Sequence, residues 1–484
     1  MIKTALIRLT KGSLIYGLGG VLQRFMGLLL LPFFTQALTP EDYGVVALIS
    51  LIGVAMSGLL SLGTGNSMGL LYYREEDHSK RPTIIWTNLL LLVLNGLIWY
   101  AIIFFLAPTL SDLMFQTERY TNLIRLSFLG AIFATITDPW LAYLRMEERA
   151  KKYVILTLIS SLISILLSIY LVLFLQQGVM GLVLALVIAN GLMFLITGAT
   201  VGRYLSFRLD INLFSPLVRI GFPSIFGLFA FLLIDYADRQ MIERMVSLSA
   251  LGIYSLGYSF GMVIMIATNA FATAWPPFFM SYINKPEEAR KVFANVLTYY
   301  VIGFSILSVF FFFIAQPIVF FMTAPAFHQA WTVVGLVAAG YALKGCYLIT
   351  LPGIYFAKKL YLQSTIEWVA AIINIALNLL LIPIYGFVGA ALATFISYLC
   401  LPVLTFIVSR RYLTVDYQWR RLGFAAVIAV FFSSIIFINS AQHASELRIS
   451  LITNFGIIIV FCLVVYNFIL SVRERELIRI KLRV

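Results

Sequence analysis

Long apolar runs, separated by short stretches of charge, proline or glycine, follow one another along the whole chain. A membrane-spanning helix needs about 20 predominantly apolar residues, and these runs reach that length. They lack the strict alternation of apolar and polar residues that is typical of strands in a membrane barrel. The pattern therefore predicts about fourteen transmembrane helices. Their ranges are 13–36, 43–71, 83–108, 121–144, 153–175, 179–202, 217–240, 250–280, 292–315, 331–356, 361–382, 386–408, 422–440 and 449–471.

The chain also contains a duplication, visible at a shift of 208 residues. YGVVAL at 43–48 falls on LGIYSL at 251–256, GVMGLVLA at 178–185 falls on GFVGAALA at 386–393, and RYL at 203–205 recurs at 411–413. Each copy holds six predicted helices, an even number, so the second copy enters the membrane in the same orientation as the first.

The predicted fold is therefore an all-α polytopic membrane protein with two parallel six-helix repeats and two additional helices. The predicted domains are an N-terminal lobe at 1–208, a C-terminal lobe at 209–417, and the two additional helices with a basic tail at 418–484. Two such lobes can rock against each other around a central site, which is the alternating-access mode of transport.

The composition agrees with a membrane protein and disfavours most enzymes. Of 484 residues, 61% are hydrophobic and 11% are charged, and the mean hydropathy is +0.97. The short connections leave little room for a folded soluble domain, and no phosphate-binding loop of the GxxxxGK[ST] type is present. The three cysteines lie inside apolar runs and suggest no disulfide or metal framework. We therefore expect no catalytic residue, no bound metal and no cofactor.

Basic residues predict the orientation of the helices. Alternate connections together hold 27 Lys and Arg side chains, whereas the opposite connections hold only Arg119, Arg239, Arg244 and Arg448. Because cytoplasmic loops carry the excess of Lys and Arg, both termini are expected in the cytoplasm. The net charge of +13 is spread over every second loop and forms no single basic face, so nucleic-acid binding is disfavoured.

Two basic residues stand out because they lie near the middle of predicted spans. Arg24 and Lys344 are each about a dozen residues from the ends of their helices. A basic side chain at that depth costs roughly 2.5 to 3.5 kcal/mol on insertion scales. We hypothesise that both line a water-filled cavity and bind an anionic group such as a phosphate or pyrophosphate. A structural ion pair is the alternative.

Acidic residues also enter the spans. Asp235 and Arg239 are four residues apart on one predicted helix, which also carries Asp238, so a local ion pair is natural there. Asp138 lies toward the cytoplasmic end of the fourth predicted helix, and Glu367 lies about two turns into the eleventh. Each is a candidate site for a coupling H⁺ or Na⁺ ion. Each could equally neutralise a basic neighbour.

Three segments carry a resemblance to a known family: GSLIYGLGGVLQRFMGLLLLPFFTQALTPEDYGVVAL near the start, VSLSALGIYSLGYSF in mid-chain, and IPIYGFVGAALATFISYLCLPVLTF from residue 382. The chain resembles the polysaccharide flippases, for O-antigen or exopolysaccharide repeat units, of the multidrug/oligosaccharidyl-lipid/polysaccharide exporter superfamily. The resemblance covers almost the whole chain and implies a fold like that of the multidrug and toxin extrusion transporters.

The resemblance implies translocation of an undecaprenyl-pyrophosphate-linked oligosaccharide repeat unit from the inner to the outer leaflet of the bacterial inner membrane. Arg24 fits the family's cationic central cavity, whereas Lys344 fits by chemistry only. The implied partners are the lipid-linked oligosaccharide and membrane lipids, with the polysaccharide polymerase and chain-length proteins as candidates.

Other functions stay open on the sequence alone. A cation-coupled multidrug antiporter of the same fold would be expected to have an anionic site in the membrane; Arg24 and Lys344 argue against it, but Asp235 keeps it open. A lipid II flippase shares the duplicated fold. A membrane-embedded polysaccharide polymerase or ligase would be expected to carry a large outward loop with catalytic residues, whereas the outward connections here are short.

Overall fold

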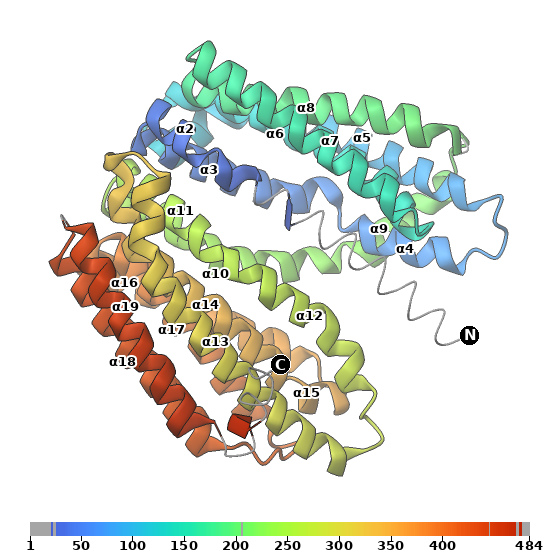
Figure 1. Cartoon of the computed structure of the whole chain (residues 1–484). Coiled ribbons are helices and arrows are strands. Elements are labelled where there is room, and N and C mark those ends of the chain that lie inside the picture. The colour runs from blue at the N-terminus through green and yellow to red at the C-terminus, as the bar shows by residue number, and fades with distance from the viewer. Residues whose placement is uncertain (1–20, 23–25, 205–206, 445, 471–473, 477–484) are drawn as a thin grey trace. The chain divides into compact units, whose positions relative to one another are not determined.

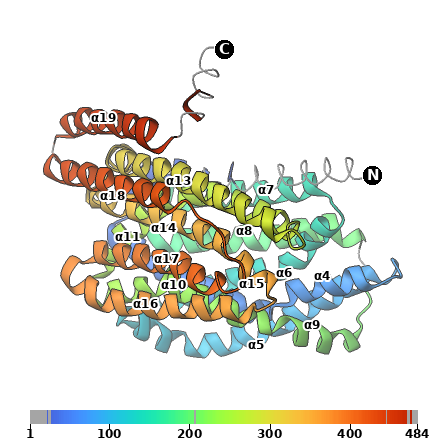
Figure 2. The same ribbon diagram turned by 90° about the horizontal axis from the view of Figure 1, so that it is seen from below.

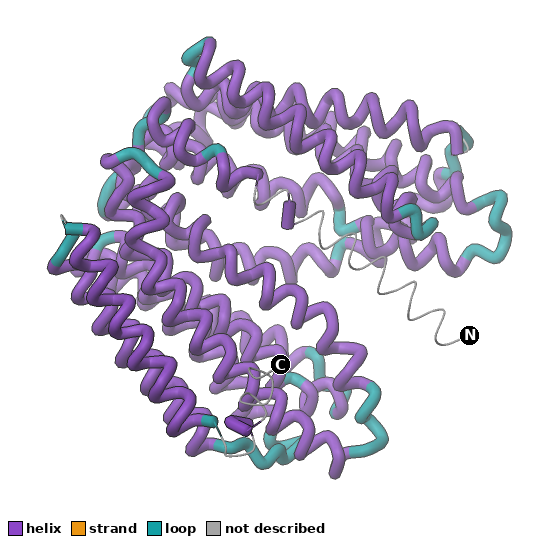
Figure 3. The backbone as a smooth tube through the Cα atoms, viewed as in Figure 1, coloured by secondary structure: helices purple, strands orange, loops and turns teal. Residues whose placement is uncertain are grey.

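The computed structural model describes residues 21–22, 26–204, 207–444, 446–470 and 474–476. Within these residues every regular element is a helix, and the connecting loops are short (Figure 3). Packing divides the chain into two compact units, residues 1–243 and 244–484. The duplication predicts a boundary at residue 208, but that boundary separates sequence repeats and is not tested by the division into compact units. It stays a prediction.

The described part of the first unit is a bundle of helices (Figure 1), and the predicted span 217–240 is divided between two of them, α9 and α10. Its central helix is α6, which packs against α3, α5 and α8. The bounds are α2 (Leu31–Ala37), α3 (Pro40–Ser61), α4 (Thr64–Arg74), α5 (Arg81–Phe115), α6 (Thr121–Met146), α7 (Ala150–Ser168), α8 (Gly178–Val201), α9 (Phe214–Gly221) and α10 (Pro223–Met245), with a π-helical turn at Ile169–Phe174 after α7.

The second unit is organised around α14, which packs against α11, α12, α13 and α17. Its elements are α11 (Leu248–Gly261), α12 (Met265–Met280), α13 (Pro286–Met322), η6 (Pro325–Ala330), α14 (Trp331–Thr350), α15 (Pro352–Phe356), α16 (Tyr361–Tyr385), α17 (Phe387–Ser409), α18 (Trp419–Gln442), α19 (Leu447–Val464) and a π-helical turn at Val465–Ile469.

Among the described residues, eleven helices are long and apolar enough to cross a membrane. Two further helices, α6 with 26 residues and α10 with 23, also have the length of a span. The first predicted helix, 13–36, lies partly outside the described residues. The helical membrane fold predicted from the sequence is therefore confirmed, and the number of helices agrees roughly with the predicted fourteen.

The boundaries differ from the prediction where the backbone changes direction inside an apolar run. The predicted helix 43–71 is divided at Leu62 and Gly63, whose φ angles of 50° and 65° are left-handed and end α3. Conversely, α5 and α13 extend beyond their predicted ends, to Phe115 and Met322. Apolarity alone locates a span, but it does not report the backbone angles that break or prolong a helix.

The duplication recurs in local structure. The Thr39 hydroxyl caps α3 by accepting from the Asp42 amide at 3.2 Å, and Ser247, 208 residues later, caps α11 by accepting from the Ala250 amide at 3.0 Å. Such caps satisfy amides that have no partner within the helix. The corresponding helices of the two repeats, α3 and α11, thus begin with the same type of side-chain cap.

The two additional helices, α18 and α19, pack side by side against α13 (Figures 1 and 2). A polar network lies inside this contact: the Ser450 hydroxyl donates to Gln316 Oε1 at 2.6 Å, and Asn454 Nδ2 donates to the Ser440 hydroxyl at 2.9 Å. All four side chains are almost fully buried. Hydrogen bonds of this kind hold helices together in lipid, where water does not compete. They join α18 and α19 to the second repeat.

Candidate functional site

The break between α3 and α4 is a rigid feature of the first unit. Helix α9 packs directly against this break: a Cβ atom on Gly221 would lie only 2.7 Å from the carbonyl carbon of Gly63. The Ser67 hydroxyl of α4 also donates to the Leu217 carbonyl oxygen of α9 at 2.7 Å. A non-glycine residue with left-handed backbone, as at Leu62, persists only where the surroundings hold it, and such positions cluster at functional sites.

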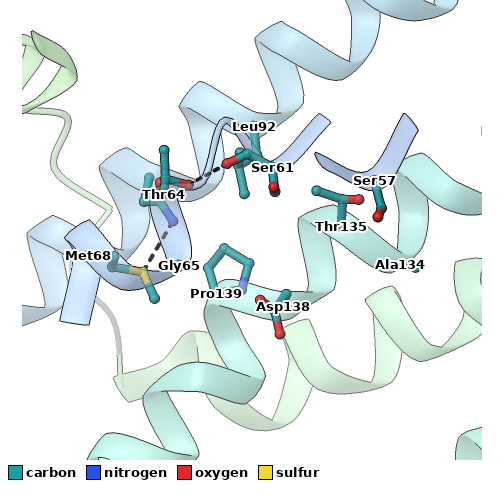
Figure 4. Close-up of a pocket in the computed structure, with 11 residues that line it drawn as sticks. Ser57, Ser61, Thr64, Gly65, Met68, Leu92, Ala134, Thr135, Asp138 and Pro139 are labelled. Carbon is teal, nitrogen blue, oxygen red and sulfur yellow. Dashed lines mark hydrogen bonds between the residues drawn. The ribbon is translucent and has the colours of Figure 1, made fainter. Parts of the chain in front are cut away.

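A cavity of about 300 Å³ lies beside this break, between α3, α4, α5 and α6 of the first unit (Figure 4). Side chains from α3 and α4 and side chains from α6 converge on it in Figure 4. Its polar lining comprises Ser57, Ser61, Thr64, Asn88, Thr135 and Asp138.

The hydroxyl groups of this lining already donate their protons to the backbone. Ser57, Ser61 and Thr135 bond the carbonyl oxygens of Val54, Gly58 and Ala131, three or four residues earlier, at 2.7, 3.1 and 2.8 Å. Each hydroxyl oxygen also has acceptor lone pairs. The hydroxyls are therefore better placed to accept a hydrogen bond from a ligand than to donate one.

Asn88 is the most deeply buried polar residue on the α5 side of the cavity, with 1% of its surface exposed. Its Nδ2 group donates to the sulfur of Met68 at 3.2 Å, a weak acceptor. Its Oδ1 atom is buried and has no hydrogen-bond partner among the described residues. An unpaired buried polar atom is unfavourable, so this carboxamide is a candidate ligand-binding group.

Asp138 lies at the exposed part of the lining and pairs with Arg145, whose Nη2 atom is 3.4 Å from its carboxylate. The two side chains are 56% and 47% exposed, so water screens their attraction. The next residue, Pro139, carries no amide hydrogen, so the Thr135 carbonyl oxygen loses the bond that a helix would normally supply. That oxygen is a further acceptor at the cavity.

Lys344, the mid-span cation of the second unit, is half-buried on α14. It lies twelve residues before the end of the apolar segment Pro325–Phe356, about 18 Å along a helix axis. Its ammonium group is 5.8 Å from the ring centroid of Tyr341 and 5.7 Å from that of Tyr398. Both distances fall in the range of cation–π attraction, which offsets part of the cost of a charge at this depth.

The two tyrosines that face Lys344 are themselves fixed. Tyr341 and Tyr398 are almost completely buried, and the Tyr341 hydroxyl is 2.9 Å from the hydroxyl of Tyr258 on α11. Gly340 permits this packing, since a Cβ atom there would lie 3.1 Å from the Tyr398 ring. Three helices, α11, α14 and α17, thus position the aromatic surroundings of one cation.

Glu367 is 6% exposed on α16 and is held by neutral donors. Its Oε1 atom accepts from the Tyr347 hydroxyl at 2.6 Å and from Gln363 Nε2 at 3.1 Å. Its assignment as a coupling residue or an ion-pair partner stays a prediction.

The charges on α10 form a separate group in the first unit. Asp238 is fully buried and lies 3.9 Å from the guanidinium of Arg239, which in turn stacks 4.2 Å from the ring centroid of Tyr236. Asp235 is on the same helix, but its side chain lies outside the described residues, as does Arg24. The predicted roles of all four residues therefore stay predictions.

Sequence reasoning missed the hydroxyl groups of the cavity and the tyrosines around Lys344. The stretch Leu62-Gly63-Thr64-Gly65, with two glycines inside an apolar run, was the available signal for a break beside a site. The tyrosines gave no such signal, because aromatic residues are common throughout membrane helices.

The fold and these sites define a multi-pass membrane protein built from a duplicated six-helix unit. The chain belongs to the polysaccharide biosynthesis protein family, whose family model matches residues 34–343. The family resemblance inferred from the sequence is thereby confirmed. A comparison with curated protein sequences gives no match.

Solved structures share the fold at low sequence identity. The lipid II flippase MurJ in an inward closed conformation is 13% identical, with 95% of this chain and 99% of that chain covered and a TM-score of 0.73. A multidrug resistance MATE family transporter of the MOP superfamily, inward-facing, is 13% identical over 84% of this chain and 95% of that chain, with a TM-score of 0.67. A single-residue mutant of the Vibrio cholerae MATE transporter VcmN is 14% identical over 84% of this chain and 97% of that chain, with a TM-score of 0.59.

Proposed function

We propose that this protein is a flippase that moves an undecaprenyl-pyrophosphate-linked oligosaccharide repeat unit from the cytoplasmic to the outer leaflet of the bacterial inner membrane. The family match supports a role in polysaccharide biosynthesis, and flippases and transporters share its fold. The observation that carries the proposal is Lys344, a cation held at mid-span by two buried tyrosine rings.

The head group of the substrate determines what the transporter has to provide. A pyrophosphate bearing sugars cannot cross hydrocarbon unaided, whereas its polyprenyl tail can remain in lipid. A basic side chain inside the span offers a charge-assisted contact that replaces water around the pyrophosphate. In this proposal Lys344 and Arg24 bind the pyrophosphate, while the carboxylates Asp138, Asp235, Asp238 and Glu367 are candidates for coupling to H⁺ or Na⁺.

The proposal includes the orientation and the partners predicted from the sequence. Both termini face the cytoplasm, where the Lys- and Arg-rich connections are placed. The polysaccharide polymerase and the chain-length proteins act on the product in the outer leaflet and are the candidate protein partners.

The test uses cells that lack this protein and any redundant flippase. They are complemented with the wild type, Lys344→Ala or Arg24→Ala, and the lipid-linked oligosaccharide of each leaflet is extracted and quantified. Lys291→Ala is the matched control, because Lys291 is an exposed lysine at the start of α13, outside the apolar core.

We expect the oligosaccharide to accumulate in the cytoplasmic leaflet of the null strain and of both mid-span variants at normal protein levels, and the control to behave as wild type. If the null strain shows no accumulation, the flippase assignment is wrong. Export of cationic drugs lost in the null strain would then favour the antiporter.

A further inference from the structure

We propose that the cavity beside Asp138 binds one neutral sugar ring of the translocated glycan. This inference rests on the proposed function, and it adds a saccharide subsite in the first unit to the pyrophosphate-binding role given to Lys344. It is carried by the cavity, by its excess of hydrogen-bond acceptors and by the buried Asn88 Oδ1 atom that has no partner among the described residues.

The hydrogen-bond acceptors of the lining are complementary to a ligand that carries several hydrogen-bond donors. The hydroxyl protons of Ser57, Ser61 and Thr135 are already bonded to backbone carbonyls. The Ser61 oxygen also accepts from the Gly63 amide at 3.3 Å, which leaves each of the three oxygens at least one lone pair with which to accept from a ligand. Asn88 Oδ1 and the Asp138 carboxylate are acceptors as well. A sugar ring carries several hydroxyl donors around its edge, which makes it complementary to such a lining.

The charge of the lining discriminates between parts of a lipid-linked saccharide. Among the described residues that line the cavity, none is Lys or Arg, and Asp138 is the charged one. A pyrophosphate or a uronic acid would meet a carboxylate. The nearby cation, Arg145, lies outside the lining and already pairs with that carboxylate at 3.4 Å, so an anion is disfavoured. A neutral or amino sugar is accepted, so the pyrophosphate and the sugar are recognised by different groups.

The size of the cavity suits a small organic ligand. About 300 Å³ is at the lower end of the volumes of small-molecule sites. The volume is large enough for one sugar ring.

The walls are also held in place before a ligand enters. The break at Gly63 is pinned by Gly221 of α9, and Pro139 fixes the backbone of α6 next to Asp138. When the side chains and backbone of a site are already ordered, little free energy is lost in ordering them as the ligand binds.

The test measures binding of simple sugars to the full-length protein in lipid nanodiscs. The probes are the methyl glycosides of glucose, galactose, mannose and N-acetylglucosamine, with methyl glucuronide as the acidic comparison, observed by saturation-transfer NMR. Gly65→Leu adds a large side chain at the cavity lining, where a Cβ would meet nothing within 4 Å, and is designed to obstruct the cavity. Gly69→Leu is its control, since Gly69 lies one turn further along α4, is equally open and does not line the cavity.

A second pair of variants tests the lining without filling it. Thr135 and Thr137 both lie on α6 and both donate to the carbonyl four residues earlier, but only Thr135 lines the cavity. Thr135→Val therefore removes one acceptor, whereas Thr137→Val serves as the control. Loss of one hydrogen bond is expected to weaken sugar binding about fivefold.

We expect the wild type to bind at least one neutral glycoside and not the glucuronide, Gly65→Leu to abolish binding, and both controls to bind as wild type. Absence of binding of every glycoside to the wild type, or unchanged binding in Gly65→Leu and Thr135→Val, would overturn the subsite. The binding assay needs no transport, so its result is independent of the leaflet assay. A flippase with no sugar binding here keeps the proposed function and loses only this inference.

Discussion

Gly178 and Gly386, 208 residues apart, both have left-handed backbones, with φ angles of 54° and 58°. Each lies where the chain turns back into the membrane, at the start of α8 and immediately before α17. Three residues later, Gly181 and Gly389 pack closely against the backbones of Leu171 and Leu381. Both repeats therefore turn between these two helices on glycines in the same positions, although the details of the two turns differ.

This turn gives the first prediction. Gly386 combines φ 58° with ψ −141°, a region that side chains other than glycine adopt only with strain. Gly386→Ala should lower the free energy of unfolding by about 1 to 3 kcal/mol, seen as a lower melting temperature in nanodiscs. Gly423→Ala is the control, because Gly423 lies within α18 with open space around it and gains helix propensity. Equal melting temperatures for the two variants would contradict the argument.

The second prediction concerns the attachment of α18 and α19. Gln316→Leu removes the acceptor of the Ser450 hydroxyl and leaves that group buried without its partner. The protein should lose about 1 to 2 kcal/mol of stability. Asn467→Leu is the comparison, since Asn467 is exposed and its Nδ2 group donates to the Leu463 carbonyl of its own segment. Limited proteolysis should then release the C-terminal helices faster from the Gln316 variant alone; the same rate in both variants would argue against this role of the network.

The third prediction tests the surroundings of Lys344. Tyr398→Phe keeps an aromatic ring 5.7 Å from the ammonium group, whereas Tyr398→Leu removes it. If the ring holds the cation in place, the leucine variant should lower the rate of translocation about fivefold and the phenylalanine variant should stay near wild type. The measurement is the rate at which lipid-linked oligosaccharide reaches the outer leaflet, corrected for protein level. Equal losses in both variants would assign the effect to the hydroxyl group.

The fourth prediction links the break in the first unit to the cavity. Gly221→Ala would place a Cβ 2.7 Å from the Gly63 backbone, so α9 and the α3–α4 break have to move apart. Because the break forms one wall of the cavity, the variant should bind neutral glycosides more weakly than wild type. Gly202→Ala is the matched control, since a Cβ there meets nothing within 4 Å. Wild-type sugar binding in Gly221→Ala would show that the wall does not depend on this contact.

Much of the fold could be predicted, because the length and apolarity of a run of residues indicate a membrane-spanning helix. The predicted range 121–144 became α6 (Thr121–Met146), and 386–408 became α17 (Phe387–Ser409). The break at Leu62 was not predicted, because leucine is a strong helix former and a left-handed backbone leaves no trace in the pattern of apolar residues.

The candidate site was predicted only in part. Lys344 and Asp138 stood out because a charge inside an apolar run is costly and therefore informative. The side chains around them did not stand out: Tyr398 reaches Lys344 from 54 residues away in the chain, and Asn88 joins Thr135 at a cavity formed by several helices. Such neighbours depend on tertiary packing, which the pattern of a single helix does not contain.

The most direct test of the account is flipping by the purified protein. Lipid-linked oligosaccharide from the null strain is placed in proteoliposomes, and the fraction that a membrane-impermeant glycan-modifying reagent can reach is followed with time. We expect wild-type protein to bring the inner-leaflet pool within reach of the reagent, Lys344→Ala to do so much more slowly, and protein-free liposomes not to do so. An inner pool that stays protected with folded wild-type protein, with and without an H⁺ or Na⁺ gradient, would contradict the flippase assignment.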